Sequence, residues 1–433
     1  MSTFQIIILS VFLFFLFFAV LVFAGVIPFF GGAPSGVAGT VTMWGTVPES
    51  FLDDGLLALN KVNEGSFSIT YVEKRKEGFD RDLVEALASG RGPDMILLPE
   101  NLIVRHSDKV FPLPLESFSI RKFRDTFIEE GELYLTNSGI LALPFSVDPM
   151  VLFWNRDIFN SASVSVPPNS WDQFLTLAPR LTQKDQALTI HKSAIALGEF
   201  GNVTHAKDVL AMLMLQAGDS IVERGDEGLA AILGEQRGLI TPPAESALRF
   251  FTEFSNPAKT TYSWNRSLPD SKDFFIANDL AAYIGFASEI GEIRARSPHL
   301  NFDITSMPQP REVLRAGTLG RMMGIAVLKT SQNIGTAFYA SSILTGPEFL
   351  QAFAIESGLP SVRRDILSIK NPGPFGDVLN ASALMAHGWL DPSPEASVSI
   401  FRTMVDAVVS GKEKMSQAVA RANGELGNLL KAQ

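Results

Sequence analysis

The five histidines are the side chains in this chain best suited to proton transfer or metal binding, and they are scattered. They lie at His106, His191, His205, His299 and His387. A metal site needs imidazole, thiolate or carboxylate ligands at short, recognisable spacings. No histidine pair has such a spacing, and the absence of cysteine excludes disulfides, thiolate ligands and a thiol nucleophile. We therefore expect no metal site and no cofactor.

A Gly-Asp-Ser-Ile sequence at residues 218–221 is the strongest candidate for a catalytic serine, because it is similar to the Gly-Asp-Ser-Leu box of some esterases. Those enzymes need an aspartate three residues before a histidine near the end of the chain. No aspartate lies three residues before His387 or any other histidine. The sequence also contains no Gly-x-Ser-x-Gly elbow, phosphate-binding loop or dinucleotide fingerprint. We expect no catalytic residue and no enzymatic activity.

Length and charge limit the remaining classes of function. A chain of 433 residues is too long for one typical domain and comfortable for two. Its formal net charge is -10, with a pI of about 5.1. An acidic surface repels the phosphates of nucleic acid, so nucleic acid is not an expected partner.

Residues 6–26 form an apolar run interrupted only by Ser10 and Gly25. At about 1.5 Å per residue a helix of this length spans roughly 31 Å, enough to cross the hydrocarbon core of a membrane. Its length favours an uncleaved anchor in membrane lipid. A cleavable signal stays open, because Val22-Phe23-Ala24 is typical of a cleavage site. We assign residues 1–30 to this anchor or signal and the Gly-rich residues 31–39 to a tether.

The stretch Gly139–Phe159 is expected to be one long extended segment, because apolar and β-favouring residues dominate it. Pro144 and Pro149 interrupt it, and a proline cannot donate a hydrogen bond to a strand ladder. A strand with prolines at this spacing suits a chain that leaves one lobe and enters another. Asp148 lies between the prolines, as either a residue of the gap between lobes or a solvated acid on an ordinary edge strand.

The order of the elements before that stretch is typical of a parallel α/β sheet. Strand patterns at 41–46, 66–73 and 94–98 alternate with helix patterns at 48–62 and 79–88. After the stretch, we expect helix from Trp171 to Ala217, a helix at 247–254, a helix and short strand at 272–285, and closing helices over 400–430.

Several of these motifs, in the right order over about residues 40 to 430, resemble the extracellular solute-binding proteins of ABC importers, of the maltose- and sugar-binding type. The similar segments are the Trp44-Gly45 strand end, Gly90-Arg91-Gly92-Pro93-Asp94, the stretch Leu141–Phe159 with the following Pro168-Asn169-Ser170-Trp171-Asp172, Phe274–Gly285, Asn301–Pro310 and Ser357–Asp365. Asn278 and Asp279 depart from the family pattern, which has Gly-Lys there.

The resemblance implies a fold class: α/β, a two-lobed periplasmic-binding-protein-like fold with three interlobe crossing strands and a central cleft. Residues 40–146 with 306–360 would form lobe one, and residues 147–305 with 361–433 would form lobe two. Ligands of open α/β sheets bind at the carboxyl ends of the strands, which is where such a cleft lies.

The resemblance also implies a set of ligand-binding residues near the strand ends. A sugar site needs aromatic faces together with directional hydrogen-bonding groups. This chain has Phe286 where sugar binders of the group often have tryptophan. Instead of contacting ligand, each tryptophan of the set could pack in the core, and each polar residue could be solvated or cap a helix. The candidates are Trp44, Thr46, Glu100, Asn101, Asp148, Glu199, Phe200, Asn202, Trp264, Phe286, Arg321 and Trp389.

These features predict a membrane-anchored, extracytoplasmic solute-binding component of an ABC transport system. The expected partners are a small-molecule solute, an oligosaccharide in first place, and the ABC permease subunits to which it is delivered. Two alternatives stay open: a membrane-anchored sensor or scaffold with the same fold, and an anchored hydrolase, for which the sequence offers no nucleophile–base or carboxylate pair.

Overall fold

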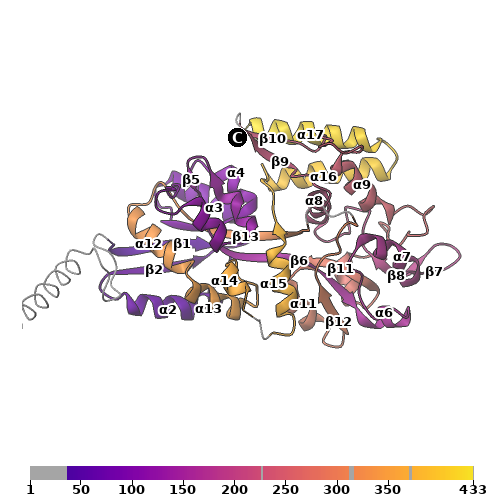
Figure 1. Cartoon of the computed structure of the whole chain (residues 1–433), viewed down its shortest axis with the longest axis horizontal. Helices are drawn as coiled ribbons and strands as arrows, with labels where there is room; N and C mark the ends of the chain where they lie inside the picture. The colour runs from indigo at the N-terminus through magenta and orange to yellow at the C-terminus, as the bar shows by residue number, and fades with distance from the viewer. Residues whose placement is uncertain (1–36, 226–227, 312–315, 370–372, 433) are drawn as a thin grey trace, which may run out of the picture. The chain divides into compact units, whose positions relative to one another are not determined.

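The computed structural model describes residues 37–225, 228–311, 316–369 and 373–432 (Figure 1). The predicted membrane segment at 6–26, and the tether up to residue 36, lie outside the described residues. Within the described part, no helix is long and apolar enough to cross a membrane. Contacts gather the chain into two compact units. Unit 1 comprises the residues up to Leu97 with Val327–Leu344, and unit 2 comprises Leu98–Ala326 with the residues from Thr345 onward.

Unit 1 is a parallel sheet with helices, as the alternating strand and helix patterns predict. Its central strand β1 pairs in parallel with β2 and β3, and the side chains of Val41 and Met43 on β1 are fully buried. The elements of unit 1 are β1 (Gly39–Gly45), η1 (Glu49–Phe51), α2 (Asp53–Val62), β2 (Phe67–Glu73), η2 (Lys76–Gly78), α3 (Phe79–Ala88), β3 (Met95–Pro99, whose last residues enter unit 2) and α12 (Ile334–Leu344).

Unit 2 contains a mixed sheet in the order β13-β6-β11-β8-β7, with β12 paired to β6 and β14 paired to β13. The first half of its chain forms η3 (Glu100–Leu102), α4 (Ile103–His106), α5 (Ile120–Thr126), η4 (Glu129–Tyr134), β4 (Leu135–Thr136), β5 (Gly139–Ile140), β6 (Leu143–Asn155), α6 (Arg156–Ser161), α7 (Trp171–Leu181), β7 (Gln183–Lys184), β8 (Ile190–Ile195) and α8 (Ala206–Gln216).

The second half forms β9 (Val222–Gly225), β10 (Gly228–Ala231), α9 (Pro243–Glu253), α10 (Ser271–Ile276), β11 (Leu280–Phe286), α11 (Glu289–Arg296), β12 (Phe302–Thr305), β13 (Thr318–Val327), α13 (Pro347–Ser357), α14 (Arg364–Leu367), α15 (Gly376–Leu384), β14 (Ala386–His387), α16 (Pro394–Val409) and α17 (Met415–Lys431). Every residue of β11 is buried, and its Tyr283 packs with Phe153 and Phe275, both of which contact Phe302.

The long extended segment predicted around Asp148 is strand β6, and it continues through both prolines. Pro144 and Pro149 lie opposite Gly324 and Gly320 of β13, and a register shift at Gly324 accommodates the first of them. The strand ends at Asn155. Its side-chain oxygen accepts hydrogen bonds from the amide of Asp157 at 3.0 Å and from the amide of Ile158 at 3.1 Å. This cap starts α6, because it satisfies amides that have no partner within the helix.

The expectation of continuous helix from Trp171 to Ala217 is wrong. Only α7 and α8 are helical, and β8 pairs in parallel with β11 between them. Residues 190–195, Ile-His-Lys-Ser-Ala-Ile, form this strand, with Ile190 and residues 193–195 buried and His191 exposed. So short a segment without regular alternation does not distinguish a strand from a helix by its sequence.

No regular strand forms at the expected third crossing, residues 357–365. Helix α13 ends at Ser357, Gly358 adopts a positive φ of 70°, and the backbone of Val362 and Arg363 bridges to Ile128 and Phe127. The lobe boundaries remain a prediction.

Candidate ligand-binding site

Three neighbouring strands of unit 2 bring predicted site residues together where they meet. In the antiparallel pairing of β6 with β13, Asp148 lies directly opposite Arg321. The third strand, β11, ends at Phe286, which pairs with Met150 of β6. Directly opposed residues of an antiparallel pair lie within side-chain contact distance, so the register places an acid and a base side by side next to an aromatic ring.

The Arg321 side chain is the centre of this arrangement. Its guanidinium carbon lies 3.7 Å from the centroid of the Phe286 ring, and one nitrogen lies 2.6 Å from Asp208 Oδ2 on α8. The same nitrogen lies 3.2 Å from His205 Nδ1. A guanidinium that rests on a ring and forms a hydrogen bond to a carboxylate is held in one orientation, with its remaining donors free to point elsewhere.

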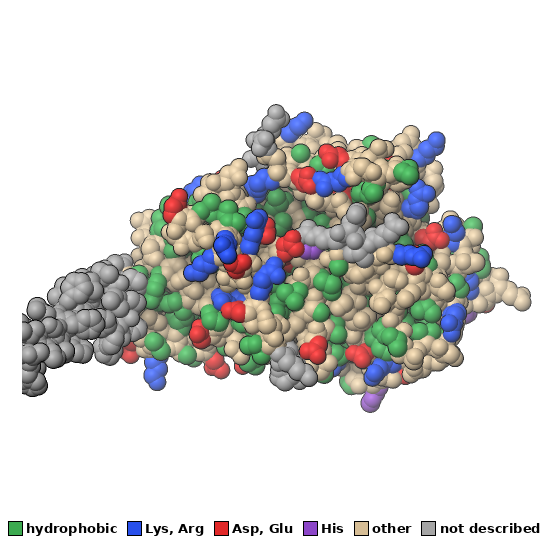
Figure 2. All heavy atoms as spheres, viewed as in Figure 1, with side chains coloured by type: hydrophobic (Ala, Val, Ile, Leu, Met, Phe, Trp, Pro, Cys, Tyr) green, Lys and Arg blue, Asp and Glu red, His purple; other side chains and the backbone are tan. Residues whose placement is uncertain are grey.

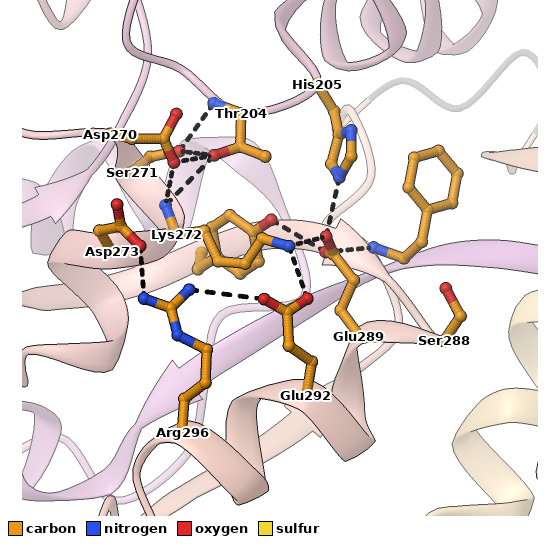
Figure 3. A network of polar contacts seen from close by, with 12 residues as sticks. Thr204, His205, Asp270, Ser271, Lys272, Asp273, Ser288, Glu289, Glu292 and Arg296 are labelled. Atoms are coloured by element: carbon orange, nitrogen blue, oxygen red, sulfur yellow. Dashed lines mark hydrogen bonds and ion pairs between the residues drawn. The ribbon is translucent and has the colours of Figure 1, made fainter. Parts of the chain in front are cut away.

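Glu289 is the centre of a network of polar contacts (Figure 3), and His205 links this network to Arg321. Its carboxylate lies 2.9 Å from His205 Nε2 and 3.0 Å from Lys272 Nζ, and it accepts hydrogen bonds from the Tyr283 hydroxyl at 2.9 Å and the Phe286 amide at 3.1 Å. Burial alone would raise the pKa of Glu289, but its contacts with His205 and Lys272 lower it to about 2. The carboxylate is therefore ionised, and it fixes the ring that Arg321 contacts.

The contacts of His205 define where its proton lies. Arginine only donates hydrogen bonds, so His205 Nδ1 accepts from Arg321, and Nε2 carries the proton that is donated to Glu289. His205 precedes α8 with a positive φ of 59°, which turns its ring toward β11. The chain Glu289–His205–Arg321 is thus a directional relay of hydrogen bonds that orients the guanidinium.

Local sequence explains why Glu289 can reach this position. Gly285 precedes Phe286 on β11, and a side chain there would collide with the carboxylate of Glu289 and the ring of Tyr283. Asp270 caps α10 by accepting from the Lys272 amide at 3.0 Å, and so places Lys272 beside Glu289.

Two further carboxyl groups border Arg321. Asp148 accepts hydrogen bonds from the Ser288 amide at 3.0 Å and from the Ser288 hydroxyl at 2.6 Å. Burial nevertheless raises the pKa of Asp148, and burial raises the pKa of Glu100 to about 7 against the opposing effect of Arg321. At neutral pH Glu100 therefore exists in both protonation states, so it can accept or donate a hydrogen bond.

A third acid, Glu130 of η4, lies buried beside Glu100 and Asp148. Only 2% of its surface is exposed, and within the described part of the chain neither carboxyl oxygen has a hydrogen-bond partner. A Cβ on Gly320 would collide with this carboxyl, and one on Gly388 would lie 3.1 Å from Oε1. Burial, with the charges of Glu100 and Asp148, raises the pKa of Glu130 well above its usual value.

Lys207 and Asp391 border the same region. Their side chains lie 2.8 Å apart, and Lys207 Nζ lies 5.8 Å from the centroid of the Trp389 ring. Burial alone would lower the pKa of Lys207, but Asp391 and Asp208 raise it. Trp389 itself is 6% exposed and stacks on Phe401 at 5.9 Å, so most of its surface packs in the core.

We refer to Glu100, Glu130, Asp148, Asp208, Phe286 and Arg321, with His205, Lys207, Glu289, Trp389 and Asp391 around them, as the Arg321 cluster. All of its members belong to unit 2. Its charges are mixed, and Figure 2 likewise shows basic and acidic side chains interspersed on the face viewed there. Planar groups with both donors and acceptors can orient a neutral, polar molecule as well as an ionic one.

The structure does not bring the remaining predicted residues of unit 2 into this cluster. Trp264 is fully buried and donates a hydrogen bond from Nε1 to Asn202 at 3.0 Å. Glu199 lies 3.4 Å from Arg266. The Phe200 ring lies 5.1 Å from the Arg402 guanidinium. We refer to these residues as the Glu199 group. Asn101 is half-buried in η3 beside Glu100.

Trp44 and Thr46 are half-buried at the end of β1 in unit 1, where Lys74 Nζ lies 3.6 Å from the centroid of the Trp44 ring. Their contact with ligand remains a prediction, as do the other ligand contacts.

Several members of the cluster do not stand out in the sequence. His205 and Asp208 are three residues apart at the start of a helix, a spacing that places them on one face, and Glu289 stands in the first turn of α11, where acids are common. Glu130 is one acid among three in η4. Only the fold reveals that these side chains converge, because they come from segments far apart in the chain.

Comparison with known proteins supplies the family. The profile of a family described as bacterial extracellular solute-binding protein matches residues 58–372. This chain belongs to that family. The match covers more than half of the sequence and confirms the resemblance predicted from its motifs.

Individual relatives are distant in sequence and close in fold. A binding protein of Brucella abortus is 19% identical over 296 residues, 65% of this chain and 66% of its own length, so the chain spans just under two thirds of that relative. The crystal structure of the cyclic alpha-maltosyl-1,6-maltose binding protein from Arthrobacter globiformis matches with a TM-score of 0.75 and 16% identity, over 91% of this chain and 99% of that one.

The sugar-binding protein MalE from Xanthomonas citri matches with a TM-score of 0.70 and 19% identity, over 91% of this chain and 98% of that one. At these identities the likeness establishes the fold, and it confirms the predicted α/β fold class of the periplasmic-binding-protein type.

Proposed function

We propose that this protein is the solute-binding component of an ABC importer, and that it binds an oligosaccharide at the Arg321 cluster. The observation that carries the proposal is the fixed guanidinium of Arg321, which lies on Phe286 opposite Asp148 and forms a hydrogen bond to Asp208. Five residues implied by the family resemblance join this cluster: Glu100, Asp148, Phe286, Arg321 and Trp389.

The chemistry of the cluster supports a hydroxyl-rich ligand. Carboxylates accept two hydrogen bonds from neighbouring hydroxyls, and a guanidinium donates two to neighbouring oxygens. Glu289 and His205 hold Arg321 in place, which reduces the side-chain entropy lost on binding. The names of the Arthrobacter and Xanthomonas proteins state that those relatives bind an oligosaccharide and a sugar, in agreement with this proposal.

The proposal extends to transport and location. The solute is released unchanged to permease subunits in the cytoplasmic membrane, and residues 6–26 anchor the protein there with the binding domain on the extracytoplasmic side. Protease added to intact spheroplasts should then digest the domain. Digestion only after lysis would contradict this orientation.

The direct test is titration calorimetry of the full chain with maltotriose, maltotetraose and a cyclic maltooligosaccharide, in a detergent without a sugar headgroup. We expect at least one of them to bind. The variant Arg321→Met keeps a chain over Phe286 and loses all donors, so it should bind at least tenfold more weakly, the equivalent of about 1.4 kcal/mol.

A matched control is Arg402→Met, which removes a second arginine that lies over a phenylalanine, in the Glu199 group. It should leave binding unchanged. If Arg402→Met weakens binding and Arg321→Met does not, the site lies at the Glu199 group. If no saccharide binds, the sugar proposal fails and the sensor or scaffold alternative takes its place.

A further inference from the structure

The Arg321 cluster contains more acids than its cations neutralise. Three of its acids have a basic partner: Asp208 pairs with Arg321, Asp391 with Lys207, and Glu289 with Lys272. His205 lies 2.9 Å from the same Glu289, so it provides no basic partner for another acid. Among the described residues, no ion pair involves Glu100, Glu130 or Asp148.

These three acids lie together around two glycines. Gly320 is adjacent to Arg321 on β13 and opposite Pro149, the residue after Asp148. The Glu130 carboxyl fills the space where a side chain of Gly320 would lie. A Cβ on Gly388 would lie 3.1 Å from Glu130 Oε1 and 3.8 Å from Glu100 Cγ, so Gly388 separates the two glutamates.

Glu130 is the member that points to a ligand. An acid removed from water usually accepts or donates hydrogen bonds, because the loss of its hydration is costly. Among the described residues, both Glu130 oxygens lack such a partner while the side chain is 2% exposed. Ser288 donates two hydrogen bonds to Asp148, but none of the described residues donates one to Glu130.

We propose that the solute of this site carries a positively charged nitrogen, as an amino sugar does, and that Glu130 with Glu100 and Asp148 receives that nitrogen. The inference rests on the proposed function for the location of the site and adds the charge of the ligand. An ammonium group donates three hydrogen bonds, one for each carboxyl group, and its charge offsets their repulsion.

The raised pKa values of all three acids agree with this arrangement. Burial and mutual repulsion raise the pKa of Glu130, and burial raises those of Glu100 and Asp148. A cation among them favours the ionised forms, so its binding should release protons near neutral pH.

The test compares three probes by titration calorimetry of the full chain at low ionic strength: the glucosamine trimer, the neutral N-acetylglucosamine trimer and spermidine. Preference of at least tenfold for the glucosamine trimer over its acetylated form supports the inference and the proposed function together. Equal or tighter binding of the acetylated form overturns the inference and leaves the proposed function standing. If only spermidine binds, the sugar proposal is overturned and the positive charge inferred for the ligand is supported. If none of the three binds while a maltooligosaccharide does, the inference is overturned and the proposed function stands.

Variants locate the effect at Glu130. Glu130→Gln has the same shape without the charge and should remove the preference for the amino trimer, whereas Glu130→Asp keeps the charge and should retain part of it. The matched control is Glu129→Gln at the exposed neighbouring position, which should keep the full preference. A preference that survives in Glu130→Gln, with its melting temperature unchanged, would overturn the assignment to Glu130.

Discussion

Replacement of Glu289 by glutamine should destabilise the protein more than any other single change in the network of Figure 3. The pKa of Glu289 falls from 4.5 to about 2 on folding, because contacts with His205 and Lys272 overcome the effect of burial. A fall of this size corresponds to roughly 3 kcal/mol of folding free energy, at about 1.4 kcal/mol per pKa unit. Glutamine cannot supply this contribution.

The contribution has a defined pH dependence. A carboxyl group whose pKa is depressed in the folded state stabilises that state above its unfolded pKa, here 4.5, and loses the effect as the pH falls toward about 2. The difference in unfolding free energy between wild type and Glu289→Gln should therefore be greatest at neutral pH. It should shrink progressively below pH 4.5.

Urea denaturation followed by tryptophan fluorescence at several pH values measures this difference. Glu292→Gln is the matched control, because Glu292 binds the same Lys272 at 2.8 Å but its side chain is 44% exposed. Exposed ion pairs contribute up to about 1 kcal/mol. A cost for Glu289→Gln no larger than that for Glu292→Gln, or a cost independent of pH, would refute the role assigned to Glu289.

Two further changes test the acids of the cluster. Folding raises the pKa of Glu100 from 4.5 to about 7, so its contribution to stability is present below pH 4.5 and is lost as the pH rises through 7. Glu100→Gln should therefore be more stable than wild type above neutral pH; a difference in unfolding free energy between the two, measured by urea denaturation, that does not change with pH would contradict this. Gly320→Ala would push a methyl group against the Glu130 carboxyl and should lower the free energy of unfolding by about 1–3 kcal/mol. The loss should be smaller in a Glu130→Ala background, and equal losses in both backgrounds would show that the two residues do not interact.

Local patterns in the sequence predicted most of the elements. Apolar alternation and glycine or proline boundaries predict β1, β2, α3 and β6, because the apolar residues along each segment are the ones that the fold buries. The failure at β8 has a different cause: its sequence, Ile-His-Lys-Ser-Ala-Ile, lacks a run of β-favouring residues, and its pairing with β11 makes it a strand. No local signal reports such a partner.

The site was predictable only in part, for a related reason. Asp148, Phe286 and Arg321 stand at strand ends within recognisable family motifs. Glu130 and Glu289 gain their importance from glycines elsewhere in the fold, Gly320 and Gly285, which leave room for their carboxyl groups. A sequence does not show that a distant glycine faces a particular glutamate.

A crystal structure of the full chain with a saccharide that binds in calorimetry would show whether solute binds at the Arg321 cluster. We expect ligand density within hydrogen-bonding distance of Arg321 and Asp148, with Glu100 and Glu130 beside it. Density at the Glu199 group instead, with Arg321 and Asp148 untouched by ligand, would contradict it.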